Sequence, residues 1–148
     1  MSAIKESVDI ARRPEDVFTY VTNPEHLPEW QESIVSVRPV GDAPLTVGSR
    51  VVVTRRIGRR EVPMTTEVTE LDPPRSWRLD GIDGPIRGHV KGTIEPIAEG
   101  ERSRVTLSVD FEEHGIGRVI GPLVIRPHAR KEMPQNELTL KRLLEGGA

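Results

Sequence analysis

The stretch Asn23-Pro24-Glu25-His26-Leu27-Pro28-Glu29-Trp30 lies between a short helical pattern and a long series of strand patterns. Upstream, Pro14 occupies a position that the first turn of a helix tolerates, and three apolar residues follow it at helical spacing: Val17, Phe18 and Val21. The stretch itself has room for about one more helical turn, which would pack Leu27 and Trp30. The sequence therefore predicts two short helices that connect directly to a sheet.

Strand patterns flank these helices on both sides. Before them, residues 3–10 alternate between apolar and polar side chains, interrupted only by Glu6 at an apolar position. After them, strand-like segments are divided by glycine and proline turns at intervals of roughly 8 to 12 residues, as in an antiparallel meander. We expect these further strands at residues 34–40, 49–57, 60–71, 76–80, 86–94 and 104–112.

Two of these strands indicate how the sheet faces its core. In the last strand, apolar residues alternate with polar ones, so that one face is buried: Val105, Leu107, Val109 and Phe111. In residues 86–94, Gly88 and Gly92 replace side chains on the inward face, which permits sharp curvature or the close approach of another backbone. We therefore expect a curved sheet.

The C-terminal part of the chain predicts one long helix. No glycine occurs from Pro122 to Glu145, and apolar residues recur there at spacings of three and four. Pro127 and Pro134 should each kink or interrupt this helix, because proline removes a backbone hydrogen bond. A curved sheet folded around such a helix is an α+β architecture, and it leaves space between the two. We infer that this space holds a small, mostly apolar molecule.

Composition limits the kind of protein. The 148 residues fit a single domain, 1–148, and contain no cysteine, which excludes disulfides and thiolate chemistry. The 21 Lys and Arg against 23 Asp and Glu give a net charge of -2, which argues against a nucleic-acid partner. No apolar run approaches the roughly 20 residues of a spanning helix, and no signal-peptide pattern precedes the first strand. We expect a cytoplasmic protein without stable membrane insertion.

The order of these elements resembles the START-like (SRPBCC) superfamily, in particular its bacterial polyketide cyclase/dehydrase and lipid-transport branch. The resemblance covers nearly the whole chain, and four segments carry it: Ile10 to Phe18, Asn23 to Trp30, Glu67 to Pro74 and Leu140 to Glu145. It implies a Bet v 1-like helix-grip fold, in which a seven-stranded antiparallel sheet wraps around the C-terminal helix, with two short N-terminal helices. It also implies a cavity for lipids, sterols, polyketides or similar molecules. Binders, carriers and cyclases share this fold without a common catalytic motif.

Alternation along the strands assigns the walls of the expected cavity. Ligand-binding candidates come from several strands and from the helix: Met64, Thr66, Trp77, Leu79, Val90, Leu107, Val109, Ile120, Leu123, Val124 and His128. Most are apolar, as in small-molecule pockets generally. Any one of them could equally fill an ordinary core, because periodic apolar positions are usually packing residues.

His128 is the one candidate for catalysis. Its imidazole could bind a carbonyl or transfer a proton near neutral pH, or it could face solvent, because Pro127 leaves its direction open. The other histidines, His26, His89 and His114, lie in a polar connector, on the wet face of a strand and at a strand end. Histidine pairs and carboxylates at ligand spacing are absent, so we expect no metal and no cofactor.

Four arginines, Arg55, Arg56, Arg59 and Arg60, flank Gly58 at the tip of one expected hairpin. They could attract an anionic group. The simpler interpretation is a solvated hairpin end that guards a sheet edge against aggregation, and it leaves these arginines outside the site.

Three functions are compatible with this reading. A binder or carrier of a small hydrophobic metabolite requires no reactive residue. A cyclase, aromatase or dehydratase would fold a reactive chain in the cavity, with His128 and an Arg or Thr moving a proton. A protein-binding module of the same general fold, which docks to a chaperone or forms a homodimer, would show a large exposed apolar patch and no enclosed volume. The outer face of the meander is too charged for such a patch.

Overall fold

The structure, a computed structural model, describes residues 4–41, 45–83, 86–113 and 126–146. Seven strands form one antiparallel sheet in the order β1-β7-β6-β5-β4-β3-β2. They are β1 (Ile4–Ile10), β2 (Ile34–Pro39), β3 (Arg50–Ile57), β4 (Arg60–Asp72), β5 (Ser76–Gly81), β6 (Ile86–Ile97) and β7 (Arg102–Glu113). Consecutive strands from β2 to β7 are neighbours, and β1 pairs with β7, from Ile4 opposite Val109 to Ile10 opposite Ser103.

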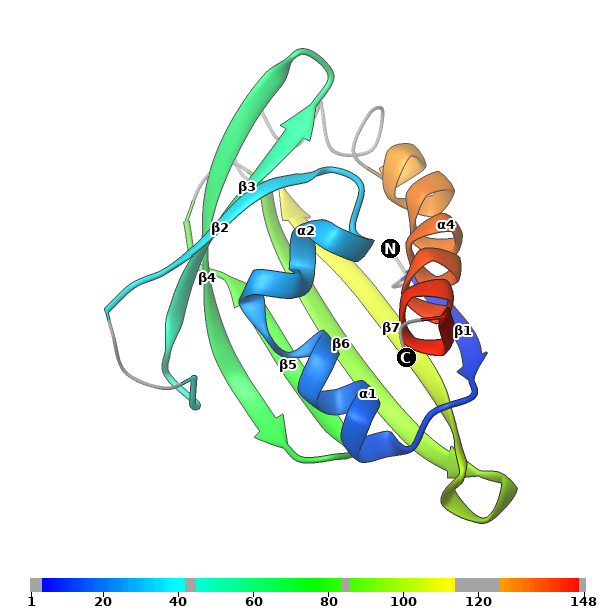
Figure 1. Ribbon diagram of the computed structural model, residues 1–148. Helices are drawn as coiled ribbons and strands as arrows, with labels where there is room; N and C mark the ends of the chain where they lie inside the picture. The colour runs from blue at the N-terminus through cyan, green and yellow to red at the C-terminus, as the bar shows by residue number, and fades with distance from the viewer. Residues whose placement is uncertain (1–3, 42–44, 84–85, 114–125, 147–148) are drawn as a thin grey trace.

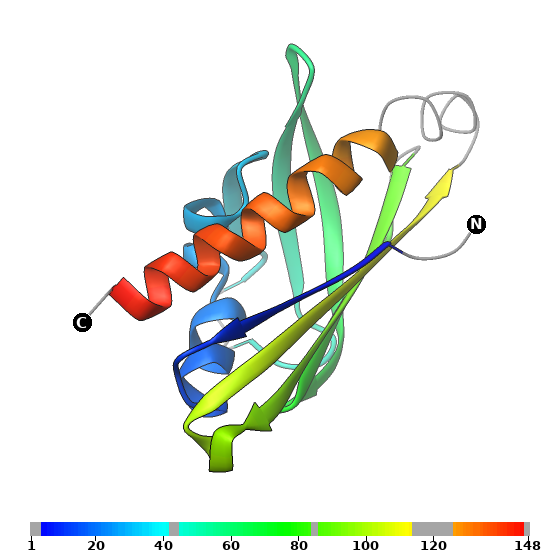
Figure 2. The same ribbon diagram turned by 90° about the vertical axis from the view of Figure 1, so that its right-hand side faces the viewer.

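Helices lie on the concave side of this sheet. They are α1 (Pro14–Val21), α2 (Leu27–Trp30) and α4 (Arg126–Gly146), and short 3-10 turns occur at Pro24–His26 and Ala98–Gly100. Figure 1 shows α1 and α2 beside each other against the curved sheet, and Figure 2 shows α4 crossing the sheet obliquely. This is the α+β helix-grip architecture, and it confirms the fold predicted from the sequence.

The strand bounds agree closely with those expected, with one correction in β6. This strand runs to Ile97, past Pro96, whereas the turn residues led us to end it at Ile94. Pairing between β5 and β6 reaches only Thr93, so beyond this point β6 has β7 as its one neighbour. A proline can stand there because one side of the strand needs no hydrogen bonds.

The C-terminal helix α4 is continuous over its described length. Pro127 lies in its first turn, where a missing N–H breaks no helical hydrogen bond. Pro134 lies inside the helix, and the helix continues through it. Of the two predicted effects, the interruption is wrong, and the kink stays a prediction. Residues 122–125 of the expected helix lie outside the described residues.

Hydrogen bonds fix the C-terminal end of α4 to the end of β1. The Lys141 Nζ donates to the backbone carbonyl of Asp9 at 2.8 Å, and the Glu145 carboxylate accepts from the backbone N–H of Ala11 at 2.8 Å. Near these contacts Leu140 is fully buried in the core. These contacts therefore hold the C-terminal end of α4 on the concave side of the sheet, next to its edge strand β1.

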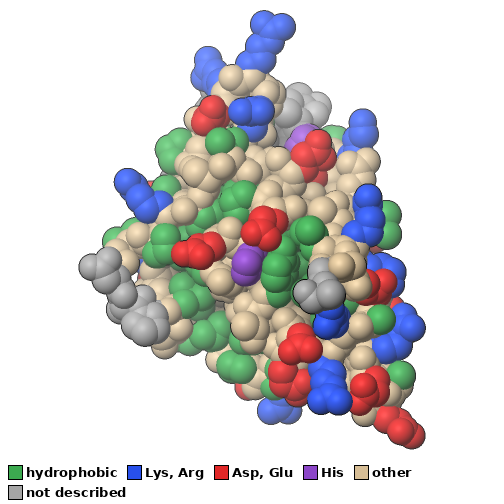
Figure 3. Space-filling view, in the orientation of Figure 1, with side chains coloured by type: hydrophobic (Ala, Val, Ile, Leu, Met, Phe, Trp, Pro, Cys, Tyr) green, Lys and Arg blue, Asp and Glu red, His purple; other side chains and the backbone are tan. Residues whose placement is uncertain are grey.

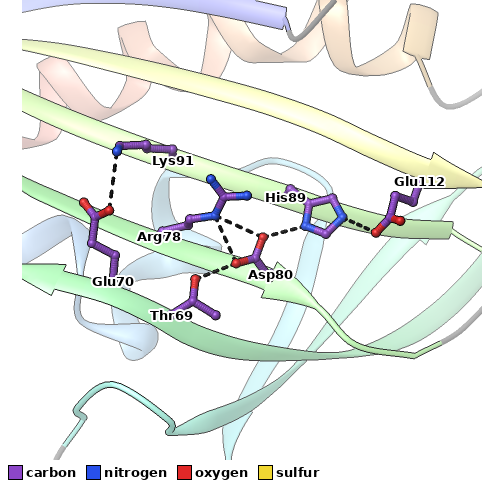
Figure 4. A network of polar contacts seen from close by, with 7 residues as sticks. All are labelled: Thr69, Glu70, Arg78, Asp80, His89, Lys91 and Glu112. Atoms are coloured by element: carbon purple, nitrogen blue, oxygen red, sulfur yellow. Dashed lines mark hydrogen bonds and ion pairs between the residues drawn. The ribbon is translucent and has the colours of Figure 1, made fainter. Parts of the chain in front are cut away.

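A polar network covers part of the convex face of the sheet (Figure 4). Asp80 accepts hydrogen bonds from Thr69 at 2.5 Å and from Arg78 at 3.0 Å, and it lies 2.5 Å from His89 Nδ1. The His89 Nε2 lies 2.6 Å from a carboxylate oxygen of Glu112. Burial acts to raise the pKa of Asp80, but the bonds from Arg78, Thr69 and His89 outweigh it and lower the pKa to about 2.

Candidate functional site

The concave face of the sheet and the helices bound a cavity of about 170 Å³. Its walls are mainly apolar and come mostly from β3 to β7, α2 and α4, with Val21 of α1 and Ile34 of β2. On the face of the molecule seen in Figure 3, Lys and Arg lie mostly around the edge, and hydrophobic side chains reach the surface nearer the centre. The fold therefore places a mainly apolar compartment between the sheet and its helices.

Many of the residues predicted from alternation line this cavity. They are Met64, Thr66, Trp77, Leu79, Val90, Leu107, Val109 and His128. The remaining three candidates, Ile120, Leu123 and Val124, lie outside the described residues. The structure thus brings the described candidates around one space, and their role in ligand binding stays a prediction.

Leu71 also lines the cavity, although alternation from Met64 and Val68 would bring Glu70 inward instead. The pairing of β4 with β5 shifts register between Val68 and Glu70. A β-bulge of this kind adds one residue to a strand and exchanges the faces beyond it. Pattern reasoning missed Leu71 because an alternating sequence does not reveal where the ladder skips a residue.

One part of the cavity wall is polar. Six side chains meet there, and we call them the polar cluster: Gln31, Ser33, Arg55, His128, Glu132 and Asn136. They come from three places in the chain, namely the segment between α2 and β2, strand β3 and helix α4. Within this cluster Glu132 and Asn136 are buried.

Glu132 is the centre of the polar cluster. Its Oε2 accepts hydrogen bonds from Asn136 Nδ2 at 2.7 Å and from Ser33 Oγ at 3.1 Å. Its Oε1 lies 3.0 Å from His128 Nε2, which donates in the tautomer that carries its proton on Nε2. The Asn136 Oδ1 accepts from the backbone N–H of Glu32 at 3.1 Å. These bonds tie α4 to the segment that follows α2.

His128 lies at the rim of the cavity. Its side chain is 57% exposed, whereas that of its partner Glu132 is 9% exposed. A histidine that contacts both solvent and a buried carboxylate can pass a proton between water and a molecule in the cavity. The prediction that His128 faces the site is consistent with this position, and a catalytic role remains untested.

Arg55 belongs to this site, so the solvated-hairpin interpretation is wrong for this residue. Its guanidinium donates to Ser33 Oγ at 2.8 Å and to Gln31 Oε1 at 3.0 Å. The side chain keeps some accessible surface because it faces the cavity, yet protein surrounds it closely. Burial therefore lowers the pKa of Arg55, and the negative charge of Glu132 opposes this effect. The other three arginines of the hairpin, Arg56, Arg59 and Arg60, are exposed.

Two patterns in the sequence could have revealed the polar cluster. His128, Glu132 and Asn136 are spaced four residues apart, which places them on one face of a helix. Arg55 continues the inward alternation of Val51 and Val53, so it is a charged residue on an apolar face. A polar residue in such a register favours a specific role over simple packing.

Within the described parts of the chain, no three His, Asp or Glu side chains gather closely enough to hold a metal ion. None of the described helices is both long enough and apolar enough to cross a membrane.

Comparison with known proteins agrees with this architecture. Residues 1–145 match the family described as "Polyketide cyclase / dehydrase and lipid transport". No curated protein matches the chain. Similar solved structures include TTHA0849 from Thermus thermophilus, with 19% identity, a TM-score of 0.79 and coverage of 99% of both chains.

Two further solved structures extend this comparison. A START superfamily protein from Mycobacterium smegmatis has 16% identity and a TM-score of 0.72, with coverage of 99% of this chain and 97% of that one. The di-domain ARO/CYC BexL from the BE-7585A biosynthetic pathway has 14% identity and a TM-score of 0.71, and the match covers 97% of this chain and 47% of BexL. The TM-scores of these matches show a shared fold, and the family match spans residues 1–145. The chain therefore belongs to the family described as polyketide cyclase / dehydrase and lipid transport.

Proposed function

We propose that this protein binds a small, mostly apolar molecule in the cavity between the sheet and α4. The observation that supports this most is the composition of the cavity wall, which is mainly apolar and includes the polar cluster. Pockets for small molecules have this composition, because burial of apolar surface supplies affinity and a few polar groups fix orientation. The family description, which includes lipid transport, points the same way.

The size of the cavity limits the ligand. A volume of about 170 Å³ is close to the roughly 150 Å³ of an engineered apolar cavity that takes up benzene. We therefore expect the enclosed part of the ligand to be a single ring, a small fused ring or a medium-length alkyl chain.

Thermal unfolding with a panel of neutral apolar compounds tests this proposal. Octan-1-ol, naphthalene and related molecules should raise the Tm in a saturable way, because a ligand that binds only the folded state stabilises it. A larger residue in the wall, Val90→Phe, should abolish the effect, whereas Val35→Phe at an exposed position of β2 should not. A panel without any stabilising compound would contradict the proposal.

A second candidate function is an enzyme that moves protons on a ligand in the same cavity. The observation in its favour is the His128–Glu132 pair at the rim, with a distance of 3.0 Å between His128 Nε2 and Glu132 Oε1. A histidine paired with a carboxylate is a common general acid or base. BexL, which shares the fold, is described as an ARO/CYC protein, and the family description includes cyclases and dehydrases.

Hydrogen–deuterium exchange tests this enzymatic candidate. The protein in D₂O should accelerate exchange at the carbon next to the carbonyl of 2-tetralone, a small two-ring ketone, as followed by NMR. His128→Gln should remove the acceleration, whereas His26→Gln, at a histidine outside the cavity lining, should retain it. Equal exchange by the wild type and by His128→Gln would exclude His128 as the acid or base.

A location in the cytoplasm and the formation of a homodimer remain predictions from the sequence. Size-exclusion chromatography with light scattering would determine the oligomeric state.

A further inference from the structure

We infer that the molecule bound in the cavity carries an acidic group, such as a carboxylate, and that Arg55 binds this group. The inference rests on the proposed binding function and names the chemical class of its ligand. It predicts an amphipathic acid, with its apolar part against the strand walls and its acidic end at the polar cluster.

The first observation is that Arg55 lacks an anionic partner among the described residues. Within the described part of the chain, its guanidinium donates to the neutral oxygens of Ser33 and Gln31, and no carboxylate lies within ion-pair distance of it. The two other arginines on β3 differ in this respect, because Arg50 lies 3.5 Å from Glu67 and Arg56 lies 3.9 Å from Glu61. With respect to the residues that the structure describes, Arg55 is thus the β3 arginine that lines the cavity without an ion pair.

The second observation is that the nearest acid of the cluster is already occupied. Glu132 accepts hydrogen bonds from Ser33 and Asn136 and contacts His128. Ser33 stands between the two charges, since it accepts from Arg55 and donates to Glu132. The charge of Glu132 therefore acts on the pKa of Arg55 through space, without a direct bond between the two side chains. This leaves N–H groups of Arg55 available to a ligand.

The third observation is the surroundings of the guanidinium. Arg55 shares its face of β3 with Val51 and Val53, which are buried and line the cavity. A positive charge in such a setting loses hydration, and a hydrogen-bonded anion compensates for that loss better than a neutral acceptor. Arginine is suited to this task because its planar N–H groups match the two oxygens of a carboxylate.

A matched pair of ligands tests the inference directly. Octanoate and octanamide have nearly the same shape and differ in charge. Isothermal titration near neutral pH should show octanoate binding to the wild type about 10-fold more tightly than octanamide, or more, as expected for a charge-assisted hydrogen bond. Arg55→Met should remove this preference and keep the affinity for octanamide. Arg50→Met, on the same strand and outside the cavity lining, should keep the preference.

The outcomes separate this inference from the proposed function. Equal binding of both probes, or tighter binding of octanamide, would overturn the role of Arg55 and leave a binder of neutral apolar molecules. Binding of neither probe would overturn the inference, and the neutral panel would then decide the proposed function independently. If Arg55→Met does not fold, Arg55→Lys provides the second variant, and it should retain a reduced preference for octanoate because it keeps the charge without the planar geometry.

Discussion

The indole ring of Trp77 on β5 lies directly over Gly92 on β6, its partner across the sheet. A methyl group at Gly92 would overlap the ring carbons of Trp77. On its other side Trp77 meets Phe18 of α1 in an edge-to-face contact, with ring centroids 6.2 Å apart. The predicted close approach at an inward glycine is therefore real, but a side chain approaches the glycine instead of a backbone.

Gly92→Ala should destabilise the protein, because Trp77 cannot move without disturbing Phe18 and the cavity wall. We expect a loss of about 1–3 kcal/mol in the free energy of unfolding, measured by urea denaturation, as for overpacked cores. Gly88→Ala on the same strand is the control, since an added methyl group there would meet Phe111 at an ordinary distance of 3.8 Å. Equal losses in the two variants would contradict this explanation.

Glu137 on α4 should make stability depend on pH. It is buried, and one of its carboxylate oxygens has no hydrogen-bond partner in the described part of the chain. Burial raises the pKa of Glu137 to about 8, and the charge of Glu6 on β1 adds to this shift. In the unfolded chain the carboxyl group loses its proton near its ordinary pKa of 4.5. Between this pH and about pH 8, the folded protein therefore keeps a proton that the unfolded chain has released.

The contribution of Glu137 to stability should therefore fall as the pH rises from about 5 to 8. Glu137→Gln should be more stable than the wild type near pH 8, by on the order of 2 kcal/mol, and should differ less near pH 5. Thermal unfolding at both pH values measures this difference. Glu15→Gln, at an exposed position of α1, is the control and should show no such dependence. If the stability difference between Glu137→Gln and the wild type were the same at both pH values, this would contradict the raised pKa of Glu137.

His89 on the convex face should hold its proton more strongly than an ordinary histidine. Burial acts to lower the pKa of His89, but its bonds with Asp80 and Glu112 outweigh this and raise the pKa above 6.5. The stability from this contact should be complete below that value and should be lost as the pH rises through the raised pKa.

An NMR titration of the His89 ring measures this shift. Asp80→Asn should lower the pKa of His89 and, at about pH 6, reduce stability by about 1 kcal/mol, as for a partly exposed ion pair. A His89 pKa that Asp80→Asn leaves unchanged would show that the network of Figure 4 does not form in solution.

Asn136 should be the most sensitive neutral residue of the polar cluster. It donates to Glu132 and accepts from the backbone N–H of Glu32, so its loss would remove one hydrogen bond from the buried Glu132 carboxylate and the side-chain acceptor of the Glu32 N–H. Asn136→Ala should lower the free energy of unfolding by about 1–3 kcal/mol in urea denaturation. Gln135→Ala, one residue earlier and less buried, should change it little. Comparable effects of the two variants would mean that the cluster does not hold α4 to the segment after α2.

The sequence predicted the sheet well because one face of most strands alternates cleanly. The register of Val105, Leu107 and Val109 follows from this alternation alone. It could not predict Leu71, because the bulge after Val68 depends on how β4 and β5 pair. It also missed Arg55 and Glu132, which are 77 residues apart in the sequence and share Ser33 as a partner only in the folded chain.

Quenching of tryptophan fluorescence tests the central claim most directly. Trp30 and Trp77 are the two tryptophans of the chain, and both line the cavity. A bromine atom quenches such a ring at short range, so 8-bromooctan-1-ol, a neutral apolar probe, reports binding in the cavity without relying on Arg55. We predict saturable quenching that octan-1-ol reverses by competition and that Val90→Phe abolishes. Quenching that fails to saturate, or that persists unchanged in Val90→Phe, would contradict an apolar molecule bound between the sheet and α4.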